Sequence, residues 1–317
     1  MERELEFEKP VAELEKAIEK LKNSATESKG DFNAQIAELE KNCEERKREI
    51  YDSLTPWQTI QVARHPRRPV LHDYITMMFT DFVELHGDRC FGDDRAMIGG
   101  FATLSGKKVM LIGHSKGKDV NENVRRNFGM ARPEGYRKAM RLMRLAEKFG
   151  IPIVTFIDTA GAYPGLDAEQ RGQAEAIARN LTEMAKLEVP IVSIVTGEGG
   201  SGGALGIGVA DSVLMLSNAV YSVISPEGCA SILWRDAAYS PQAAESLKLT
   251  AKSLLSLGVI DEIVQEPAGG AHSNHQAAAE AIKAAILKHI RKLSQLSVSK
   301  LTARRFEKFS TMGKFNK

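Results

Sequence analysis

The chain has 317 residues, of which 43% are hydrophobic and 26% are charged, with 43 basic and 41 acidic side chains. This length allows one large domain or two ordinary ones, and the apolar fraction is sufficient for a hydrophobic core. The balance of charge argues against a nucleic-acid-binding protein, which usually carries a basic domain. Cys43, Cys90 and Cys229 lie far apart and form no C-x-x-C pair, which argues against a zinc ribbon or a redox dithiol.

The first ten residues, MERELEFEKP, are acidic and polar and lack the apolar core of a signal peptide. No run reaches the roughly eighteen apolar residues that a membrane span requires. We therefore expect a cytoplasmic protein without a membrane-spanning segment.

Residues 1–55 differ in pattern from the rest of the chain. Apolar residues recur at heptad-like spacing among Glu and Lys in two stretches, separated by a polar break at 23–31. They are Val11, Leu14, Ile18 and Leu21 in the first stretch and Ile36, Leu39 and Cys43 in the second. This spacing predicts two helices in an antiparallel hairpin. The stripe is too narrow for a domain core, so we expect the hairpin to pack on the main body or on another chain.

Downstream, the chain alternates between strand-like and helix-like segments. A connector with three prolines, 55–69, leads into a predicted amphipathic helix over 72–88 that ends near Gly87. Apolar runs predict strands at 97–104, 108–114, 151–158, 189–196, 212–217, 219–225 and 259–265. Helices are predicted at 133–150, about 168–187, about 202–210, 226–235, 241–257 and 275–296. Continuous apolar strands separated by helices indicate an α/β fold whose largely parallel sheet is covered on both faces.

The stretch 197-GEGGSGGALGIGVAD-211 places seven glycines directly after a predicted strand. It contains the G-x-S-x-G pattern of serine hydrolases, which would make Ser201 a nucleophile, and Asp261 and His272 follow in the chain order of a triad. However, four residues separate the strand from Ser201, whereas a hydrolase elbow places its serine at the turn itself. Alternatively, glycines at the start of a short helix expose N–H groups that suit an oxyanion. A turn needed only for tight packing is a third interpretation.

A second glycine-containing loop, 158-DTAGAYPGLDAEQRG-172, follows the strand predicted at 151–158. Its first four residues match the D-x-x-G of nucleoside triphosphatases, but that function also needs a P-loop. The nearest candidate, around Gly106, lacks the first glycine and the hydroxyl residue. We therefore interpret the segment as a ligand-binding loop at the carboxyl end of a strand, where open α/β sheets place their ligands.

A basic segment lies between these two loops and the N-terminal part of the chain. Eight Lys and Arg residues fall between Arg125 and Lys148. They could hold phosphates or an acidic partner, or form a solvated helix face. His114 ends a predicted strand beside this segment and is a conceivable general base.

Four strings in this chain closely resemble the family of carboxyltransferase alpha chains of bacterial acetyl-CoA carboxylases. They are 125-RRNFGMARPEGYRKAMRLM-143, 155-TFIDTAGAYPG-165, 197-GEGGSGGALGIGVAD-211 and 221-YSVISPEGCASILW-234. The resemblance extends over essentially the whole chain, including 265-QEPAGGAH-272 near its end. It implies a crotonase-like α/β fold, a spiral of ββα units, over 56–317, preceded by the helical hairpin of 1–55.

The resemblance also implies an activity and partners. The reaction would move a carboxyl group from carboxybiotin on a carrier protein to acetyl-CoA, giving malonyl-CoA in the first committed step of fatty-acid synthesis. The chain would act in an α2β2 heterotetramer with a separate beta chain, alongside the biotin carboxyl carrier protein and biotin carboxylase. Zinc is expected only on the beta chain, and this chain is expected to hold no metal and no covalent cofactor.

Site residues follow from the same resemblance. The adjacent amides of Gly202 and Gly203 would form an oxyanion hole. Substrate binding is expected at Gly161, Ala162, Tyr163, Gly165, Gly199 and Gly200, and phosphate or partner contacts at Arg125, Arg126, Arg137 and Lys138. Two rival classes remain from the residues alone: a self-sufficient hydratase or a serine hydrolase using Ser201, and a non-catalytic scaffold with a helical hairpin.

Overall fold

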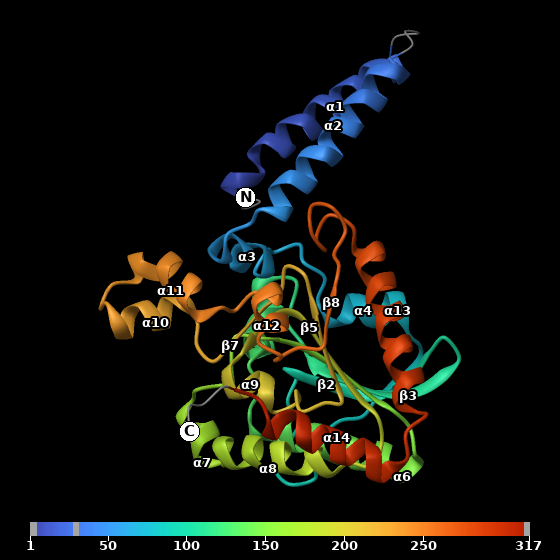
Figure 1. The fold of residues 1–317 in the computed structure, drawn as a ribbon, viewed down its shortest axis with the longest axis vertical. Helices are drawn as coiled ribbons and strands as arrows, with labels where there is room; N and C mark the ends of the chain where they lie inside the picture. The colour runs from blue at the N-terminus through green and yellow to red at the C-terminus, as the bar shows by residue number, and fades with distance from the viewer. Residues whose placement is uncertain (1–4, 28–31, 314–317) are drawn as a thin grey trace.

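The computed structural model describes residues 5–27 and 32–313. A twisted sheet forms the centre of the molecule, helices cover it, and a helical hairpin extends from one end (Figure 1). The strands are β1 Thr80–Glu84, β2 Met97–Leu104, β3 Lys107–His114, β4 Ile153–Thr159, β5 Ile191–Gly200, β6 Ser212–Leu216, β7 Val220–Ser222 and β8 Glu262–Val264.

The sheet changes from antiparallel to parallel along its width. Its order is β1-β2-β3-β4-β5-β6-β8, and β7 pairs with the far end of β5. The pairs β1–β2 and β2–β3 are antiparallel, whereas every pair from β3 onward is parallel. The long strand β5 therefore pairs with β6 through its first half and with β7 through its glycine-rich second half.

Helices precede, connect and follow the strands. They are α1 Lys9–Glu27, α2 Asn33–Asp52, α3 Pro56–Ala63, α4 Leu71–Met78, α5 Val120–Arg125, α6 Pro133–Phe149, α7 Leu166–Gln170, α8 Gln173–Lys186, α9 Ser201–Leu205, α10 Pro226–Leu233, α11 Ser240–Leu247, α12 Ala251–Ser256, α13 His275–Leu293 and α14 Val298–Ser310. Helices α6, α8 and α14 lie together below the sheet in Figure 1, while α4 and α13 pack together to the right of it. Among the described residues, no helix combines the length and apolar character that crossing a membrane requires.

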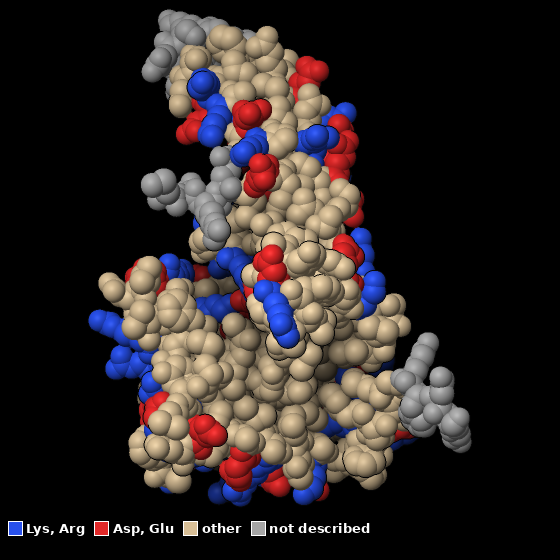
Figure 2. All heavy atoms as spheres, turned by 90° about the vertical axis from the view of Figure 1, so that its left-hand side faces the viewer, with Lys and Arg blue, Asp and Glu red and all other residues tan. Residues whose placement is uncertain are grey.

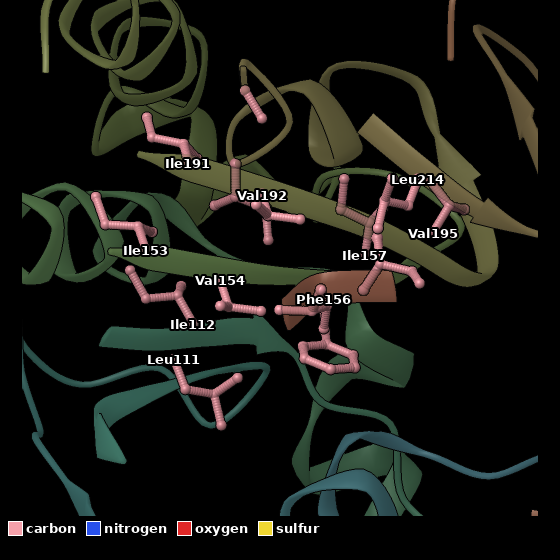
Figure 3. Close-up of a cluster of buried hydrophobic side chains, with 14 of the residues drawn as sticks. Leu111, Ile112, Ile153, Val154, Phe156, Ile157, Ile191, Val192, Val195 and Leu214 are labelled. Carbon is pink, nitrogen blue, oxygen red and sulfur yellow. The ribbon is translucent and has the colours of Figure 1, made fainter. Parts of the chain in front are cut away.

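The main core lies between the central strands and these helices. Side chains of β3, β4, β5 and β6 fill it, including Phe156, Ile157 and Val195, and all three are essentially inaccessible to solvent (Figure 3). Strands β4 and β5 are buried along nearly their whole length. Continuous burial on both faces explains why their sequences are apolar runs without alternation.

The N-terminal hairpin prediction is confirmed for the described residues. Helices α1 and α2 run side by side and away from the sheet (Figure 1). They share a small apolar cluster of their own, in which Val11, Ile18 and Cys43 are buried. Of the predicted polar break at 23–31, residues 23–27 continue α1, and 28–31 lie outside the described residues.

The predicted helix over 72–88 is wrong in its second half. The helix ends at Met78, and 80–84 forms edge strand β1. Strand β1 crosses β2 so closely at Gly100 that a methyl group there would overlap the Val83 carbonyl. The Gly99–Gly100 pair within a predicted strand was the sequence signal for this close backbone approach.

Other predicted helices are divided or shorter. Gly172, with φ of 81°, separates α7 from α8, and Lys248, with φ of 53°, ends α11 before α12 begins. The predicted 202–210 helix is only the short α9. The proline-containing connector holds α3, which begins at a capping box between Thr55 and Gln58.

Candidate active site

The glycine-rich turn between β5 and α9 lies at the carboxyl end of the parallel strands. Gly200 ends β5, and Ser201, with φ of 51°, begins α9. The first N–H groups of any helix lack intrahelical acceptors. Within the described part of the chain, neither the Gly202 nor the Gly203 amide donates to a backbone carbonyl outside its own helix. This turn therefore presents two adjacent donors.

The loop after β4 packs directly against this turn. A methyl group on Gly200 would overlap the Ala160 carbonyl, and one on Gly203 would overlap the backbone of Gly161. At Gly202, by contrast, the nearest neighbours of an added methyl group would be side-chain atoms of Ile177 at 3.8 Å. Gly200 and Gly203 thus allow the two backbones to touch, whereas the space beside Gly202 is open.

The loop is held by an internal hydrogen bond and by contacts with the segment that precedes α6. The Thr159 hydroxyl donates to the Gly161 carbonyl at 2.7 Å, and the Tyr163 amide donates to the Ala131 carbonyl at 3.0 Å. The guanidinium of Arg132 lies 4.7 Å from the centre of the Tyr163 ring, a cation–π distance. The predicted substrate residues Gly161, Ala162, Tyr163 and Gly165 therefore lie on a fixed loop beside Gly199–Gly203.

Gly199 and Gly165 accommodate aromatic rings. A methyl group on Gly199 would come 2.7 Å from the Tyr221 ring, and one on Gly165 would overlap the Tyr163 ring. Both glycines are therefore required for packing around the site.

A charged network underlies the turn. The Lys116 ammonium lies 2.7 Å from Asp158 Oδ1 and 3.2 Å from Glu198 Oε2, and Arg64 Nε lies 2.6 Å from Glu198 Oε1. Burial disfavours the charge of Lys116, but Asp158 and Glu198 outweigh that effect and raise its pKa. Burial likewise opposes the charge of Glu198, but Lys116 and Arg64 lower its pKa overall. Asp158 Oδ1 also accepts the Glu198 amide at 3.0 Å, so the network fixes the direction of β5 just before the glycines.

The buried side chain of Arg68 binds the backbone of the same strand, β5. Arg68 Nε donates to the Thr196 carbonyl at 2.7 Å, and its two terminal nitrogens contact Glu266 at 2.9 and 2.6 Å. Glu266 also accepts the Ala271 and Asn218 amides. Sequence analysis missed both Arg68 and Glu266, because nothing in a single arginine or glutamate predicts a pair so far apart in the chain.

His114 is ill suited to act as a general base. Its side chain is buried, and burial lowers its pKa to about 3. Among the described residues, neither ring nitrogen has a hydrogen-bond partner of ordinary geometry. An imidazole of such low basicity is a poor proton acceptor near neutral pH.

The serine hydrolase triad does not assemble. Asp261 accepts the Val213 amide at 2.6 Å and pairs with Lys308, while His272 contacts Glu8 at 3.2 Å. Both side chains are therefore engaged away from Ser201, and the nucleophile interpretation is wrong.

The basic segment divides into internal and accessible residues. Lys138 is 1% exposed and bonds Asp93 Oδ1 at 2.5 Å and the Asp94 carbonyl at 2.8 Å. Arg137 donates to Asp88 Oδ2 at 2.8 Å. Lys138 therefore serves the interior of the molecule rather than the phosphate or partner contact expected of it, whereas the Arg137 side chain is 21% exposed and its contact role stays a prediction.

Arg125 and Arg126 lie near the surface. Arg126 donates to the Ser115 hydroxyl at 2.9 Å and contacts His72 at 3.3 Å, and Arg125 is exposed in the last turn of α5. These two remain the accessible part of the predicted basic contact.

An apolar surface adjoins the open side of Gly202. A hollow of about 310 Å³ is lined by Ser201, Gly202, Leu205, Tyr221, Ser222, Val223, Leu247, Leu254 and Val259. Nearby, Val223 is 74% exposed, and Ile232 and Leu233 on α10 are 71% and 64% exposed. Figure 2 shows a broad area of uncharged residues on this face, around the lobe formed by α10 and α11. Large apolar side chains exposed on one face are typical of an interaction site.

One group outside this site combines metal-ligand residue types. Among the described residues, Glu8, His65 and His272 place ligand atoms within 4.8 Å of one another, between the hairpin and the body. However, the two imidazole rings are stacked, with an interplanar angle of 23°. A metal ion lies in the plane of each imidazole that binds it, and two stacked rings do not share such a point.

Comparisons with known proteins identify the family of this chain. Residues 4–313 match the family "Acetyl co-enzyme A carboxylase carboxyltransferase-like". The chain is 57% identical over 312 residues to the acetyl-coenzyme A carboxylase carboxyl transferase subunit alpha of Geobacter metallireducens, covering 98% of each chain. It is 55% identical over 311 residues to the same subunit of Aromatoleum aromaticum, covering 98% of this chain and 97% of the relative.

Solved structures support the fold. The transcarboxylase 12S structure with methylmalonyl-coenzyme A bound aligns with a TM-score of 0.54 at 21% identity, over 69% of this chain and 42% of that chain. The geranyl-CoA carboxylase beta subunit of P. aeruginosa aligns with a TM-score of 0.54 at 15% identity, over 83% of this chain and 48% of that chain. The expected crotonase-like α/β fold is therefore confirmed. By its sequence and its fold, the chain belongs to the acetyl co-enzyme A carboxylase carboxyltransferase-like family.

Proposed function

We propose that this chain is the alpha half of a carboxyltransferase that moves a carboxyl group from carboxybiotin to acetyl-CoA. In this reaction the C–N bond between the carboxyl group and biotin breaks, and a C–C bond forms at the acetyl methyl carbon. The methyl proton passes to the ureido nitrogen that the carboxyl group leaves. Biotin and malonyl-CoA are the products, so no side-chain nucleophile is required.

The observation that carries this proposal is the pair of adjacent amides at Gly202 and Gly203, next to an open space and a fixed loop. Negative charge develops on the biotin ureido oxygen as the carboxyl group leaves, and on the thioester oxygen as the methyl proton leaves. Fixed donors aimed at such an oxygen typically lower the barrier by about 3–4 kcal/mol each. Gly202 and Gly203 stabilise one of these oxyanions, and the beta chain supplies the donors for the other.

The loop residues beside these amides bind the substrate. Gly161 has no neighbour within 4 Å of an added methyl group, so its outer side is open. Tyr163, held by Arg132, forms a rigid wall next to it. Ala162, Gly165, Gly199 and Gly200 complete this surface, and Arg125 and Arg126 meet phosphate or an acidic partner.

The proposal also covers the partner proteins of this chain and its division into two domains. The beta chain, which carries the zinc, completes the cleft in an α2β2 assembly in the cytoplasm, and the carrier protein and biotin carboxylase deliver carboxybiotin. The apolar hollow at Gly202 and the exposed α10 residues are a suitable docking surface for the beta chain. Residues 1–55 form the hairpin unit, and residues 56–317 form the carboxyltransferase domain.

Subunit dependence tests the proposal directly. The purified chain, its beta subunit and the mixture are each assayed for malonyl-CoA decarboxylation driven by a soluble biotin derivative. We expect activity only in the mixture. Full activity of this chain alone would instead support a self-sufficient hydratase-type enzyme, and none in the mixture would support a scaffold.

Gly202→Ala tests the oxyanion role more cleanly than a change at Gly203. A Cβ in a helix points toward the helix N-terminus, so this methyl group enters the space in front of the amides without a clash in the protein. We expect kcat to fall about 10- to 100-fold with an unchanged melting temperature. Gly92→Ala, also free of neighbours within 4 Å, is the control and should leave kcat unchanged. Equal kcat values for the two variants would refute the oxyanion role.

A further inference from the structure

Helix α9 is too short to hold its own orientation. It has five residues, two of them glycines, and glycine is among the least favourable residues for a helix interior. Isolated helices of this length are not stable in water. The direction of the Gly202 and Gly203 amides must therefore be fixed by groups outside α9.

Tyr136 of α6 makes one such contact. Its hydroxyl donates to the Gly203 carbonyl at 3.2 Å, and its side chain is fully buried. The ring also lies directly under the end of α9, because a methyl group on Gly206 would come 2.6 Å from it. Burial raises the pKa of Tyr136, so the hydroxyl keeps its proton and remains a donor.

Asn180 of α8 joins Tyr136 to the same short helix. Its side-chain amide donates to the Tyr136 carbonyl and to the Gly206 carbonyl, both at 2.9 Å. Asn180 is 1% exposed, so water cannot replace these bonds. The Gly206 amide in turn donates to the Gly202 carbonyl at 2.9 Å. This carbonyl belongs to the same peptide unit as the Gly203 amide, so the contacts extend to the proposed oxyanion donor.

We propose that Tyr136, held in place by Asn180, is a positioning residue that aims the Gly202 and Gly203 amides during carboxyl transfer. The inference rests on the proposed function of this site. Tyr136 does not touch the substrate in this account. Its hydroxyl fixes the rotation of the Gly203–Ala204 peptide unit, which directly follows the unit that carries the Gly203 amide, and its ring fixes the distance of α9 from α6.

Two buried tyrosines make a matched test possible. Tyr74 is as inaccessible as Tyr136, but its hydroxyl has no hydrogen-bond partner among the described residues. Tyr136→Phe and Tyr74→Phe therefore remove the same atom from equally buried rings, and only the first removes a bond to α9. Both variants keep the aromatic ring that packs the core, so the fold is retained.

Steady-state kinetics are measured on both variants assembled with the beta chain. We expect Tyr136→Phe to lower kcat about fivefold to tenfold with KM for the acyl-CoA changed less than twofold, because the lost bond orients groups used in the transition state. Tyr74→Phe should keep the kcat of the unmodified protein. A purely structural role would lower the melting temperature and leave kcat per folded molecule unchanged.

The two possible failures can be told apart. If Gly202→Ala lowers kcat and Tyr136→Phe does not, the oxyanion role stands and the positioning role of Tyr136 is refuted. If neither variant lowers kcat, the oxyanion proposal itself fails. Asn180→Ala should reproduce the fall in kcat, and Tyr136→Phe combined with Asn180→Ala should lower kcat by less than the product of the two single effects, because both act through α9.

Discussion

The imidazole rings of His65 and His272 stack with their centroids 3.9 Å apart, at the contact between the N-terminal hairpin and the body. From the hairpin, Glu8 lies 3.2 Å from His272 Nε2, and the Tyr51 hydroxyl bonds Glu8. From the body, Arg67 and Arg68 face the same rings, and both disfavour a proton on His65. Burial, His272 and these arginines lower the pKa of His65 from 6.5 to about 4, and this outweighs the opposing effect of the Glu8 carboxylate.

This relationship predicts that acid destabilises the folded protein. A histidine whose pKa is lowered in the folded state contributes its full stability above its ordinary pKa of about 6.5 and loses that contribution as the pH falls toward 4. The lowered pKa of Glu8 acts in the same direction at lower pH. The free energy of unfolding, measured with denaturant, should therefore fall between pH 6.5 and 4.

The control for this prediction is His65→Phe. A phenyl ring keeps the stack on His272 but does not titrate, so the midpoint of the fall in unfolding free energy should move to lower pH. An identical midpoint in this variant would contradict the role of His65.

The same stack predicts that the cluster does not bind zinc. The Arg67 amide donates to His65 Nδ1 at 3.2 Å, so the proton of neutral His65 lies on Nε2, the nitrogen that would have to bind the ion. We expect a tenfold excess of Zn²⁺ to leave the melting temperature within about 1 °C. A stabilisation that disappears in His272→Ala would contradict this expectation.

Lys116 and Lys118 are two residues apart and should respond very differently to replacement by methionine. Lys116→Met leaves the buried carboxylates of Asp158 and Glu198 without their shared cation, so we expect a loss of about 3–5 kcal/mol in the free energy of unfolding. Lys118 is 64% exposed in its pair with Asp73, and Lys118→Met should cost less than about 1 kcal/mol. Denaturant unfolding of both variants measures the difference, and equal losses would refute the role of the network.

Alanine substitutions at the site glycines should lower stability where the glycine is tightly packed and affect substrate binding where it faces open space. Gly200→Ala forces the turn away from the Ala160 carbonyl, so we expect a loss of about 1–3 kcal/mol in unfolding free energy. Gly161→Ala meets no neighbour and should leave stability within about 0.5 kcal/mol while raising KM, because its methyl group lies on the substrate side. Thermal unfolding and kinetics of both variants test this, and an unstable Gly161→Ala would contradict it.

Much of the fold could be predicted from periodicity alone. The strands β2 to β6 are apolar runs bounded by turn residues. Because both faces of these strands are largely buried, apolar residues follow one another without alternating with polar ones. Strand β1 was missed because it lies at the edge of the sheet, where its side chains are only partly buried. The spacing of its apolar residues is also compatible with a helix. The remaining errors are helix ends set by local backbone conformation. At Gly172 and Lys248 a positive φ ends the helix, although the spacing of apolar residues predicts that it continues.

The site was predictable only in part, for a physical reason. The glycine turn and the 158–165 loop are local in sequence, so their motifs could be read directly. Tyr136, Asn180, Arg68 and Glu266 support them through contacts between distant segments, and each is an ordinary residue in its own sequence neighbourhood. Lys138 was assigned to the surface because its helix carries several other basic residues. Only the fold reveals that this lysine is buried.

The pairing of Arg68 with Glu266 also has a consequence for the order of folding. These residues are 198 positions apart, and both are buried. A buried guanidinium without its carboxylate is strongly unfavourable, so Arg68 cannot settle behind β5 until the chain has been synthesised past Glu266. The glycine turn should therefore become ordered late during synthesis, only after the segments on either side of the central sheet have come together.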